Sequence, residues 1–297
     1  MPSSLRYLIL GRGYVGQRFA QELARRGESH RLLSRATFDY TQPEALKRYL
    51  AVHRPQFVIN AAGFTGKPNV DACETQREPC MFANVTLPAL IADACAAHDL
   101  PWGHVSSGCI FTGDGPNGTG FSEADAPNFS FAQGHCSYYS GTKALGETVL
   151  AGQPQTYIWR LRIPFDGETG PRNYLTKVLT YERLLEARNS VSHLDDFVTS
   201  CLACFAKQVP YGTYNLTNPG SITTREVVAE LQRAGVTDKV FSFFASEAEF
   251  MEVAAKTPRS NCVLDTRKSE AAGVALRPVR EALRDAIFQL NFQRLAA

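Results

Sequence analysis

The sequence lacks any apolar run long enough to cross a bilayer or to form the core of a signal peptide. The longest early run, Tyr7–Leu10, is far shorter than the roughly 20 residues that a bilayer requires. Runs of basic residues are missing too, since 31 Lys and Arg are balanced by 29 Asp and Glu for a net charge of +2. Such a balance leaves no basic stripe to follow a phosphate backbone. We therefore expect neither a membrane nor a nucleic acid as partner.

Low-complexity tracts and internal repeats are also absent. The chain has 297 residues, 44% of them hydrophobic and 20% charged, which is typical of a folded soluble protein with a sizeable core. Its 8 cysteines are scattered, and a chain of this size needs no disulfide staples, so we expect reduced thiols and a cytoplasmic protein. Cys201 and Cys204 have the spacing of a metal site but no second ligand pair, so we predict core packing and no metal.

Short apolar runs alternate with helix-like stretches over residues 5–161, the pattern of an α/β fold with a parallel sheet covered on both faces. The predicted strands are Tyr7–Leu10, Arg31–Leu33, Phe57–Asn60, His104–Ser106 and Tyr157–Leu161. The predicted helices between them are Val15–Arg26, Pro43–His53, Thr86–His98 and Tyr139–Leu150. Beyond Arg162 the sequence predicts helices at Tyr174–Glu186, Thr223–Ala234 and Glu247–Ala255, and late strands at Val191–Asp196 and Tyr214–Leu216.

Three glycines, Gly11, Gly13 and Gly16, follow the first predicted strand and open the first predicted helix. In this context the spacing indicates dinucleotide binding, because a tight turn must bring the backbone to a pyrophosphate at the helix N-terminus. The alternative is a glycine-rich turn without a ligand. We predict a Rossmann-type doubly wound domain over residues 1–161, to which 191–218 return, and a smaller C-terminal substrate lobe from 162–190 and 219–297. The predicted cofactor-binding residues are Gly11, Arg12, Gly13, Tyr14, Val15, Gly16, Ala61, Ala62 and Gly63, together with Tyr139 and Lys143.

The end of the second predicted strand bears on the choice between NADPH and NADH. No carboxylate stands there to bind a ribose 2′-hydroxyl, and Arg35 together with Arg12 can flank a 2′-phosphate. We therefore favour NADPH, with NADH as the alternative if both arginines are merely solvated. Asp39 and Tyr40 follow shortly after, and can hydrogen-bond and stack on the adenine.

A phenol and an ammonium stand four residues apart at Tyr139 and Lys143, so both lie on one face of a predicted helix. We expect Lys143 to lower the pKa of Tyr139 from about 10, so that the phenol exchanges protons near neutrality. Ser107, just past the fourth predicted strand, can hydrogen-bond the same substrate oxygen. Behind a dinucleotide-binding loop, this set predicts carbonyl reduction.

These motifs resemble the extended short-chain dehydrogenase/reductase family, and within it the dTDP-4-dehydrorhamnose reductases and the bifunctional nucleotide-sugar 3,5-epimerase/4-reductases of plants. The resemblance covers nearly the whole chain. The segments that carry it are Asn60–Asp71, Ser107–Phe111, Pro127–Phe129, Pro171–Asn173, Thr217–Gly220 and Pro258–Asn261 followed by Leu264 and Asp265.

The resemblance implies that NADPH delivers hydride to C-4 of a 4-keto-6-deoxy sugar while Tyr139 protonates the oxygen. It also implies that Cys109 and Lys177 move protons at C-3 and C-5, through an enolate held by Ser107 and Tyr139. A buried structural thiol is the alternative for Cys109, and a solvated lysine or a phosphate contact the alternative for Lys177. The implied catalytic residues are Ser107, Cys109, Tyr139, Lys143 and Lys177.

The implied substrate is a nucleotide sugar, with UDP favoured over dTDP, and family members often form homodimers. The residues expected to bind it are Thr65, Asn69, Asn84, Cys109, Arg162, Arg172, Asn173 and Arg259. Two other functions remain open at this point. One is a 4-keto reductase that depends on a separate epimerase, and the other is a noncatalytic NADP-binding regulatory subunit.

Overall fold

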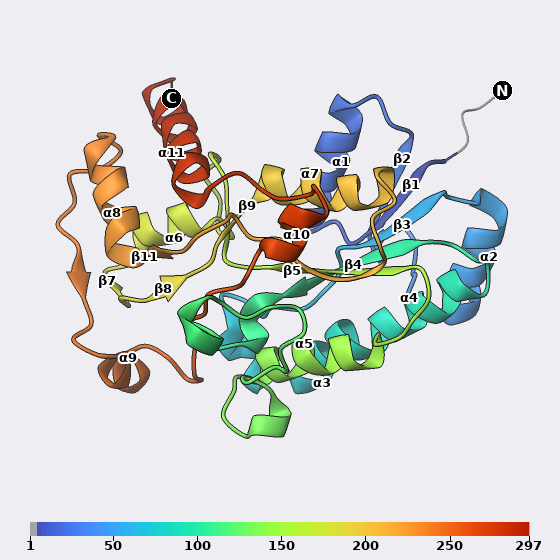
Figure 1. The fold of residues 1–297 in the computed structure, drawn as a ribbon, viewed down its shortest axis with the longest axis horizontal. Helices are drawn as coiled ribbons and strands as arrows, with labels where there is room; N and C mark the ends of the chain where they lie inside the picture. Colours follow the sequence, from blue (N-terminus) through green and yellow to red (C-terminus); the bar gives the residue numbers. More distant parts are fainter. Residues whose placement is uncertain (1–4, 297) are drawn as a thin grey trace.

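A six-stranded parallel sheet forms the centre of the protein, for which a computed structural model describes residues 5–296. The strand order is β10-β5-β4-β3-β1-β2 (Figure 1). The strands span β1 Tyr7–Leu10, β2 His30–Leu33, β3 Phe57–Asn60, β4 Trp102–Ser107, β5 Thr156–Leu161 and β10 Gly212–Asn215. Every residue of β1, β3 and β5 is buried, as expected for parallel strands covered on both faces.

Helices cover both faces of this sheet (Figure 1). On one face lie α1 (Tyr14–Arg25) and α7 (Leu194–Ala206), and on the other lie α2 (Pro43–His53), α4 (Leu87–Ala96) and α5 (Tyr138–Val149). The five predicted early strands and the four helices between them are thus confirmed, with ends that differ by at most two residues. The Rossmann-type architecture expected from the sequence is confirmed as well.

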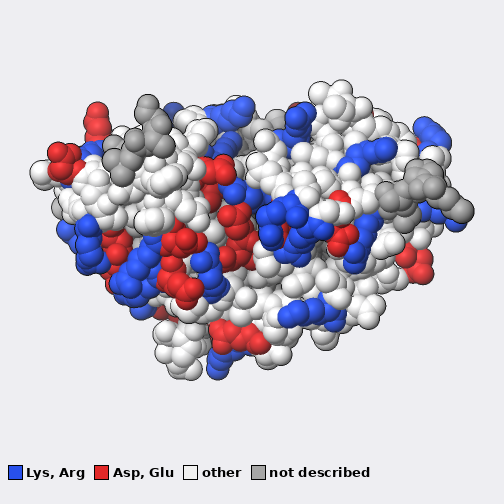
Figure 2. Space-filling model, turned by 90° about the horizontal axis from the view of Figure 1, so that it is seen from above, with Lys and Arg blue, Asp and Glu red and all other residues white. Residues whose placement is uncertain are grey.

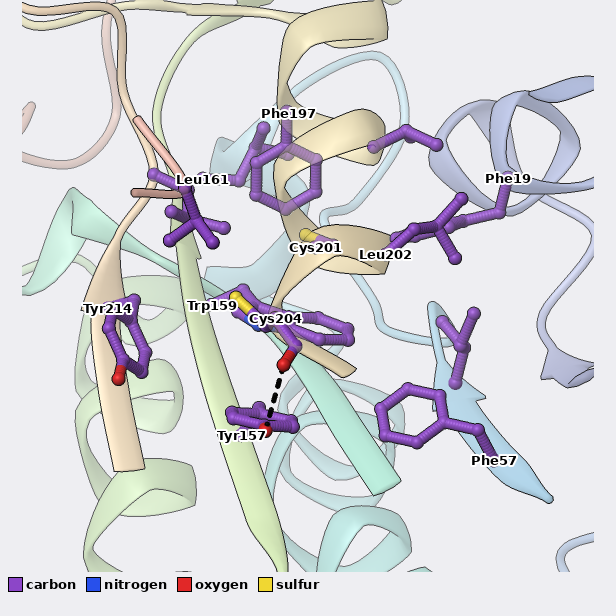
Figure 3. Packing of buried hydrophobic residues seen from close by; sticks show 14 of the residues in the cluster. Phe19, Phe57, Tyr157, Trp159, Leu161, Phe197, Cys201, Leu202, Cys204 and Tyr214 are labelled. Carbon is purple, nitrogen blue, oxygen red and sulfur yellow. Dashed lines mark hydrogen bonds between the residues drawn. The ribbon is translucent and has the colours of Figure 1, made fainter. Parts of the chain in front are cut away.

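The core beneath α7 is built around large aromatic side chains (Figure 3). Trp159 lies across Gly103 of the neighbouring strand, where an added Cβ would come within 2.0 Å of the indole. Cys201 and Cys204 lie in this core on α7, and the carbonyl of Cys204 accepts a hydrogen bond of 3.1 Å from Tyr157. Burial raises the pKa of both thiols, which agrees with the packing role expected for them.

The order of the strands reverses between β1 and β3, because the chain runs outward from β1 to β2 and then returns to the other side of β1. In open α/β sheets, ligands bind beyond the carboxyl ends of the strands at such a switch point. The glycine loop after β1 and the segment Ala61–Gly63 after β3 meet there: a Cβ on Gly11 would lie 2.5 Å from the Ala62 nitrogen. The sheet therefore places the predicted cofactor segments side by side.

A second apolar core lies in a smaller lobe beside the carboxyl ends of the strands. Its helices are α6 (Tyr174–Thr180), α8 (Thr224–Arg233) and α11 (Val279–Ala296). The chain beyond β5 also forms three two-stranded sheets. They pair β6 (Pro164–Phe165) with β9 (Ser192–His193), β7 (Arg183–Leu184) with β12 (Ser242–Phe243), and β8 (Arg188–Asn189) with β11 (Ile222–Thr223). The remaining helices are α3 (Arg77–Met81), α9 (Glu247–Val253) and α10 (Arg267–Ala271).

Two predictions for this region are wrong. The helix expected at Tyr174–Glu186 ends at Thr180, because the chain becomes extended at Tyr181 and pairs as β7. The strand expected at Val191–Asp196 is reduced to Ser192–His193, which pairs with β6 and not with the main sheet, and α7 begins at Leu194.

The stretch Arg77–Ala96 is long and apolar enough for a membrane crossing by length and composition, with a mean hydropathy of 1.3. Half of it is buried within the protein, where α4 packs against β3, β4, α2 and α5. This burial is typical of a core helix.

On the face that Figure 2 shows, positive and negative side chains are interspersed.

Candidate active site

A cavity of about 370 Å³ lies at the switch point, between the carboxyl ends of the strands and the smaller lobe. It collects segments from the glycine loop, from the ends of β3 and β4, from α5 and from α6. Its lining includes Gly13, Tyr14, Val15, Ala61, Ala62, Gly63, Thr65, Asn69, Asn84, Ser107, Tyr139, Lys143, Arg172 and Lys177. Most of the predicted site residues thus share one cavity.

The glycine loop is shaped to receive a pyrophosphate. A Cβ on Gly16 would lie 1.9 Å from the Gly11 oxygen, so the tight turn requires glycine there. A Cβ on Gly13 would meet no protein atom within 4 Å, which leaves open space in front of the first turn of α1. Gly13 is the N-cap of α1, and no side chain caps the first amides of the helix. These residues fit the diphosphate of a dinucleotide.

Gly13→Ala should weaken NADPH binding without weakening the fold. The Cβ has free space in the protein, and the backbone of Gly13 is extended, with φ −90°, so only a phosphate placed against the loop is displaced. Overpacking of this kind costs enough to weaken binding roughly 10- to 100-fold. The control is Gly170→Ala, whose Cβ would also meet nothing within 4 Å. Titration of NADPH fluorescence and thermal denaturation check both variants; equal affinities would contradict this placement of the cofactor.

The residues predicted at the adenine end of the cofactor, Arg12, Arg35, Asp39 and Tyr40, do not line the cavity. Arg12 and Arg35 are exposed, and in the described part of the chain neither guanidinium has a hydrogen-bond partner. The carboxylate of Asp39 accepts from the Thr41 hydroxyl at 2.5 Å, which lowers the Asp39 pKa. Tyr40 is only 3% exposed and packs in the core against α2, so its position does not support stacking on adenine.

The reducing residues converge from β4 and α5. The ammonium of Lys143 donates to the Val105 carbonyl at 3.1 Å, and Tyr139 lines the cavity together with Ser107 at the end of β4. The Ser137 side chain caps α5 by accepting from the Ser140 amide, so the helix begins directly before Tyr139. This brings the phenol, the ammonium and the serine hydroxyl predicted for carbonyl reduction to one wall of the cavity.

Asn84 supports the same wall from a π-helical turn, Phe82–Thr86, that precedes α4. The Asn84 side chain accepts a hydrogen bond from the Phe64 amide at 3.0 Å and donates to the Phe64 carbonyl at 2.9 Å. It also donates to the Thr142 hydroxyl at 3.1 Å. Asn84 therefore fixes the loop after β3 against α5 in addition to lining the cavity.

The expectation that Lys143 lowers the pKa of Tyr139 is wrong for this structure. Burial raises the pKa of Tyr139 well above its ordinary value, and the neighbouring Ser107 side chain opposes this only in part. Burial also lowers the pKa of Lys143, because the charged ammonium is less stable away from water. Tyr139 is therefore a neutral phenol, which is the form that donates a proton.

The α6 side of the cavity carries two of the predicted substrate-lobe cations. Lys177 is largely buried, and this burial, with the charge of Arg172 nearby, lowers the pKa of its ammonium. Arg172 donates to the Thr65 hydroxyl at 2.8 Å and to the Gly66 carbonyl at 2.9 Å. Arg172 thus ties the lobe to the loop after β3 while it lines the cavity.

Three predicted substrate contacts have protein partners and do not line the cavity. Arg259 pairs with both carboxylate oxygens of Asp71 at 2.7 Å. Arg162 is buried and donates to Asn189 and to the Ser260 carbonyl. Asn173 is fully buried and caps α6 by accepting from the Leu175 amide at 3.0 Å. Each of the three holds the lobe in place in this structure.

Cys109 is buried beside Tyr139 and does not line the cavity. It is 6% exposed and packs in a cluster with Phe111, Cys262 and Leu264, against which Tyr139 also packs. Its amide donates to the Ser107 hydroxyl at 3.2 Å. Burial raises the pKa of the thiol, although Ser107 and the charge of Arg162 act in the opposite direction.

An apolar part of the wall was not predicted from the sequence. It consists of Phe64, Val70, Leu161, Ile163 and Pro164. Phe64 and Val70 belong to the same segment after β3 as Thr65 and Asn69, so their place next to predicted contacts is the signal that points to them. Such side chains exclude water from the space beside Tyr139.

A family model described as RmlD substrate binding domain matches residues 5–292. The chain belongs to this family. The resemblance to extended short-chain dehydrogenases/reductases is thereby confirmed. A bifunctional dTDP-4-dehydrorhamnose 3,5-epimerase/dTDP-4-dehydrorhamnose reductase of Arabidopsis thaliana is 34% identical over 243 residues, which are 80% of this chain and 78% of that protein. A trifunctional relative from the same plant is 31% identical to this chain over 94% of the chain's length. The match covers only 41% of that longer relative, so the chain spans less than half of it.

Two solved structures share this fold over nearly their whole length. The UDP-rhamnose synthase of Acanthamoeba polyphaga mimivirus has a TM-score of 0.88 at 23% identity, over 97% of this chain and 100% of that one. The dTDP-4-dehydrorhamnose reductase of Bacillus anthracis, solved in complex with NADP, has a TM-score of 0.81 at 18% identity, over 98% and 99% of the two chains. At these identities the likeness shows the fold.

Proposed function

We propose that the protein is an NADPH-dependent reductase of a nucleotide-linked 4-keto sugar. The observation that carries the proposal is the convergence of Ser107, Tyr139 and Lys143 on a cavity that also opens to the glycine loop. Relatives whose names include dTDP-4-dehydrorhamnose reductase support the substrate class. The full catalytic set argues against a noncatalytic NADP-binding subunit.

Reduction requires a hydride and a proton at the two ends of one carbonyl bond. NADPH, when bound along the glycine loop, supplies the hydride to C-4. The neutral phenol of Tyr139 gives its proton to the oxygen at C-4, and Ser107 hydrogen-bonds that oxygen. The Lys143 ammonium, held by the Val105 carbonyl, stabilises the phenolate that remains. The product is a hydroxyl at C-4.

The exposed arginines at the adenine end give the proposed preference for NADPH over NADH. Arg35→Ala should raise the Kd of NADPH roughly 10- to 100-fold and leave that of NADH nearly unchanged, because only NADPH carries a 2′-phosphate for a charged hydrogen bond. The comparison with Arg12→Ala separates the two residues, and Arg31→Ala, which removes an exposed arginine on β2, is the control. Equal losses for both cofactors would contradict the assignment of Arg35.

A second activity, 3,5-epimerisation, is proposed for the same cavity. The ketone at C-4 acidifies the hydrogens on C-3 and C-5. Lys177 lines the cavity, and its lowered pKa favours the neutral amine that removes such a proton. The resulting enolate oxygen takes hydrogen bonds from Ser107 and Tyr139. The proposed donor to the opposite face is the neutral thiol of Cys109, which is buried beside Tyr139 and must reach the sugar from there. Exchange with solvent restores both groups. Epimerase/reductase relatives support this pairing of activities.

The proposed substrate is UDP-4-keto-6-deoxyglucose and the product UDP-L-rhamnose, in line with the name of the mimivirus synthase. The alternative is a reductase that takes a sugar already epimerised by a separate enzyme, which the reductase relatives favour. NADPH oxidation with each sugar distinguishes the two. NADPH oxidation with both sugars supports the bifunctional enzyme. Oxidation only with the pre-epimerised sugar supports the alternative. Oxidation with neither sugar overturns the proposed reductase.

A further inference from the structure

A buried carboxylate, Asp166, joins the glycine loop to the substrate lobe. Asp166 is 1% exposed, and each of its two carboxylate oxygens accepts two hydrogen bonds. The Oδ2 atom accepts from the Tyr14 hydroxyl at 2.6 Å and from the Arg18 guanidinium at 2.8 Å. The Oδ1 atom accepts from the Asn173 amide group at 2.8 Å and from the Glu168 backbone amide at 2.9 Å. None of these four groups takes part in the proton transfers proposed above.

The two sides of this network reach different halves of the cavity. Tyr14 lies in the glycine loop, next to the open space at Gly13, and its ring lines the cavity. Asn173 is the N-cap of α6, and the helix carries Lys177 on its inner face while Arg172 precedes it. Asn173 also donates to the Asp166 and Glu168 carbonyls, at 2.8 and 2.6 Å, so the start of α6 is held at several points.

We propose that Asp166 is a positioning residue that couples the dinucleotide loop to α6, so that NADPH and the nucleotide sugar each strengthen the binding of the other. The inference rests on the proposed function, because it assigns those two ligands to the cavity. A ligand that orders the glycine loop fixes the Tyr14 hydroxyl, and through Asp166 it fixes Asn173 and the helix that bears Lys177. Linkage requires the effect to be reciprocal.

The first test uses the ligand-free protein. Tyr14→Phe removes a single hydroxyl from Asp166 and keeps the ring. Hydrogen exchange of the amides in residues 166–180 should become faster, because the start of α6 opens more readily when one of its ties to α1 is gone. The matched control is Tyr214→Phe, which removes a phenol hydroxyl that donates to the Pro210 carbonyl at 2.7 Å and lies outside the cavity. Unchanged exchange at 166–180 in Tyr14→Phe would overturn the proposed tie.

The second test measures coupling directly, with UDP-glucose and dTDP-glucose as sugar nucleotides that are not reduced. The Kd of NADPH is measured with and without each sugar nucleotide. In the unchanged protein the better-binding sugar nucleotide should tighten NADPH roughly fivefold or more, a typical coupling. Tyr14→Phe and Asp166→Asn should each bring the ratio near one, while Tyr214→Phe should keep it. In the Asp166→Asn background, adding Tyr14→Phe should cause no further loss, because both act through the same carboxylate.

The outcomes separate the inference from the function on which it rests. If the unchanged protein binds neither NADPH nor a sugar nucleotide, the proposed function fails and the inference fails with it. If it binds both without coupling, or if Tyr14→Phe keeps the full coupling, the inference alone is overturned. If Asp166→Asn does not fold, Tyr14→Phe and Tyr214→Phe still decide between these results.

Discussion

Tyr139→Phe should greatly slow reduction while NADPH still binds. The substitution removes only the phenol proton that the proposed mechanism gives to the C-4 oxygen, and burial keeps that proton on Tyr139 at neutral pH. Loss of a general acid lowers kcat roughly 10²- to 10⁴-fold. The rate of NADPH oxidation with the pre-epimerised 4-keto sugar measures the loss, and NADPH fluorescence measures the retained binding.

The neighbouring tyrosine on the same helix provides the control. Tyr138 packs against Phe131 and Arg77, and it is not part of the cavity wall. Tyr138→Phe therefore changes the same kind of side chain one position away and should leave kcat within about twofold, as surface substitutions away from special contacts do. Comparable activity in the two variants would show that the phenol of Tyr139 is not the proton donor.

Lys177→Met should stop solvent deuterium from entering the sugar and should spare reduction of the pre-epimerised sugar. The amine is the proposed base, and loss of a base lowers the exchange rate roughly 10²- to 10⁴-fold. Burial and Arg172 lower the Lys177 pKa, so exchange in the unchanged protein should rise with pH and level off below the ordinary lysine pKa of 10.5. Lys268→Met, which removes an ammonium bonded to the Thr213 carbonyl, is the control.

Cys109→Ser completes this test from the other face of the sugar. It should slow exchange as Lys177→Met does, because a serine hydroxyl is a far weaker acid than a thiol. Cys262→Ser is the matched control, since that thiol lies in the same buried cluster and donates to the Gly108 carbonyl at 3.2 Å. If Cys109→Ser exchanges at the full rate while Lys177→Met does not, the donor is a group other than Cys109. If both exchange fully, the epimerase proposal is overturned.

The sheet and the glycine loop were predictable because their signals are local. Strands covered on both faces appear in the sequence as short apolar runs such as Phe57–Asn60, and a tight turn at a helix N-terminus requires glycine at Gly11 and Gly16. Short apolar runs outside the sheet are ambiguous, which is why Val191–Asp196 predicts a strand where α7 begins. No element was predicted for α11, although Val279, Leu283 and Ile287 recur on its buried face.

The site was predictable where residue type determines chemistry and not where partners determine it. Tyr139, Lys143 and Ser107 converge because their elements end at the same edge of the sheet. Arg259 has the charge expected of a diphosphate contact, but its guanidinium donates to both carboxylate oxygens of Asp71, which is distant in sequence. The same limit applies to the direction of the Tyr139 pKa, which depends on burial that spacing along a helix does not reveal.

The most direct measurement mixes the protein with UDP-4-keto-6-deoxyglucose in deuterated water, with and without NADPH. It follows NADPH absorbance together with deuterium at C-3 and C-5 of the sugar. The account predicts deuterium at both carbons in either condition, and NADPH consumption with a rhamnose product when the cofactor is present. The absence of both signals would contradict the assignment of this cavity as a reductase site: no deuterium incorporation and no NADPH oxidation, with this sugar or with the pre-epimerised one.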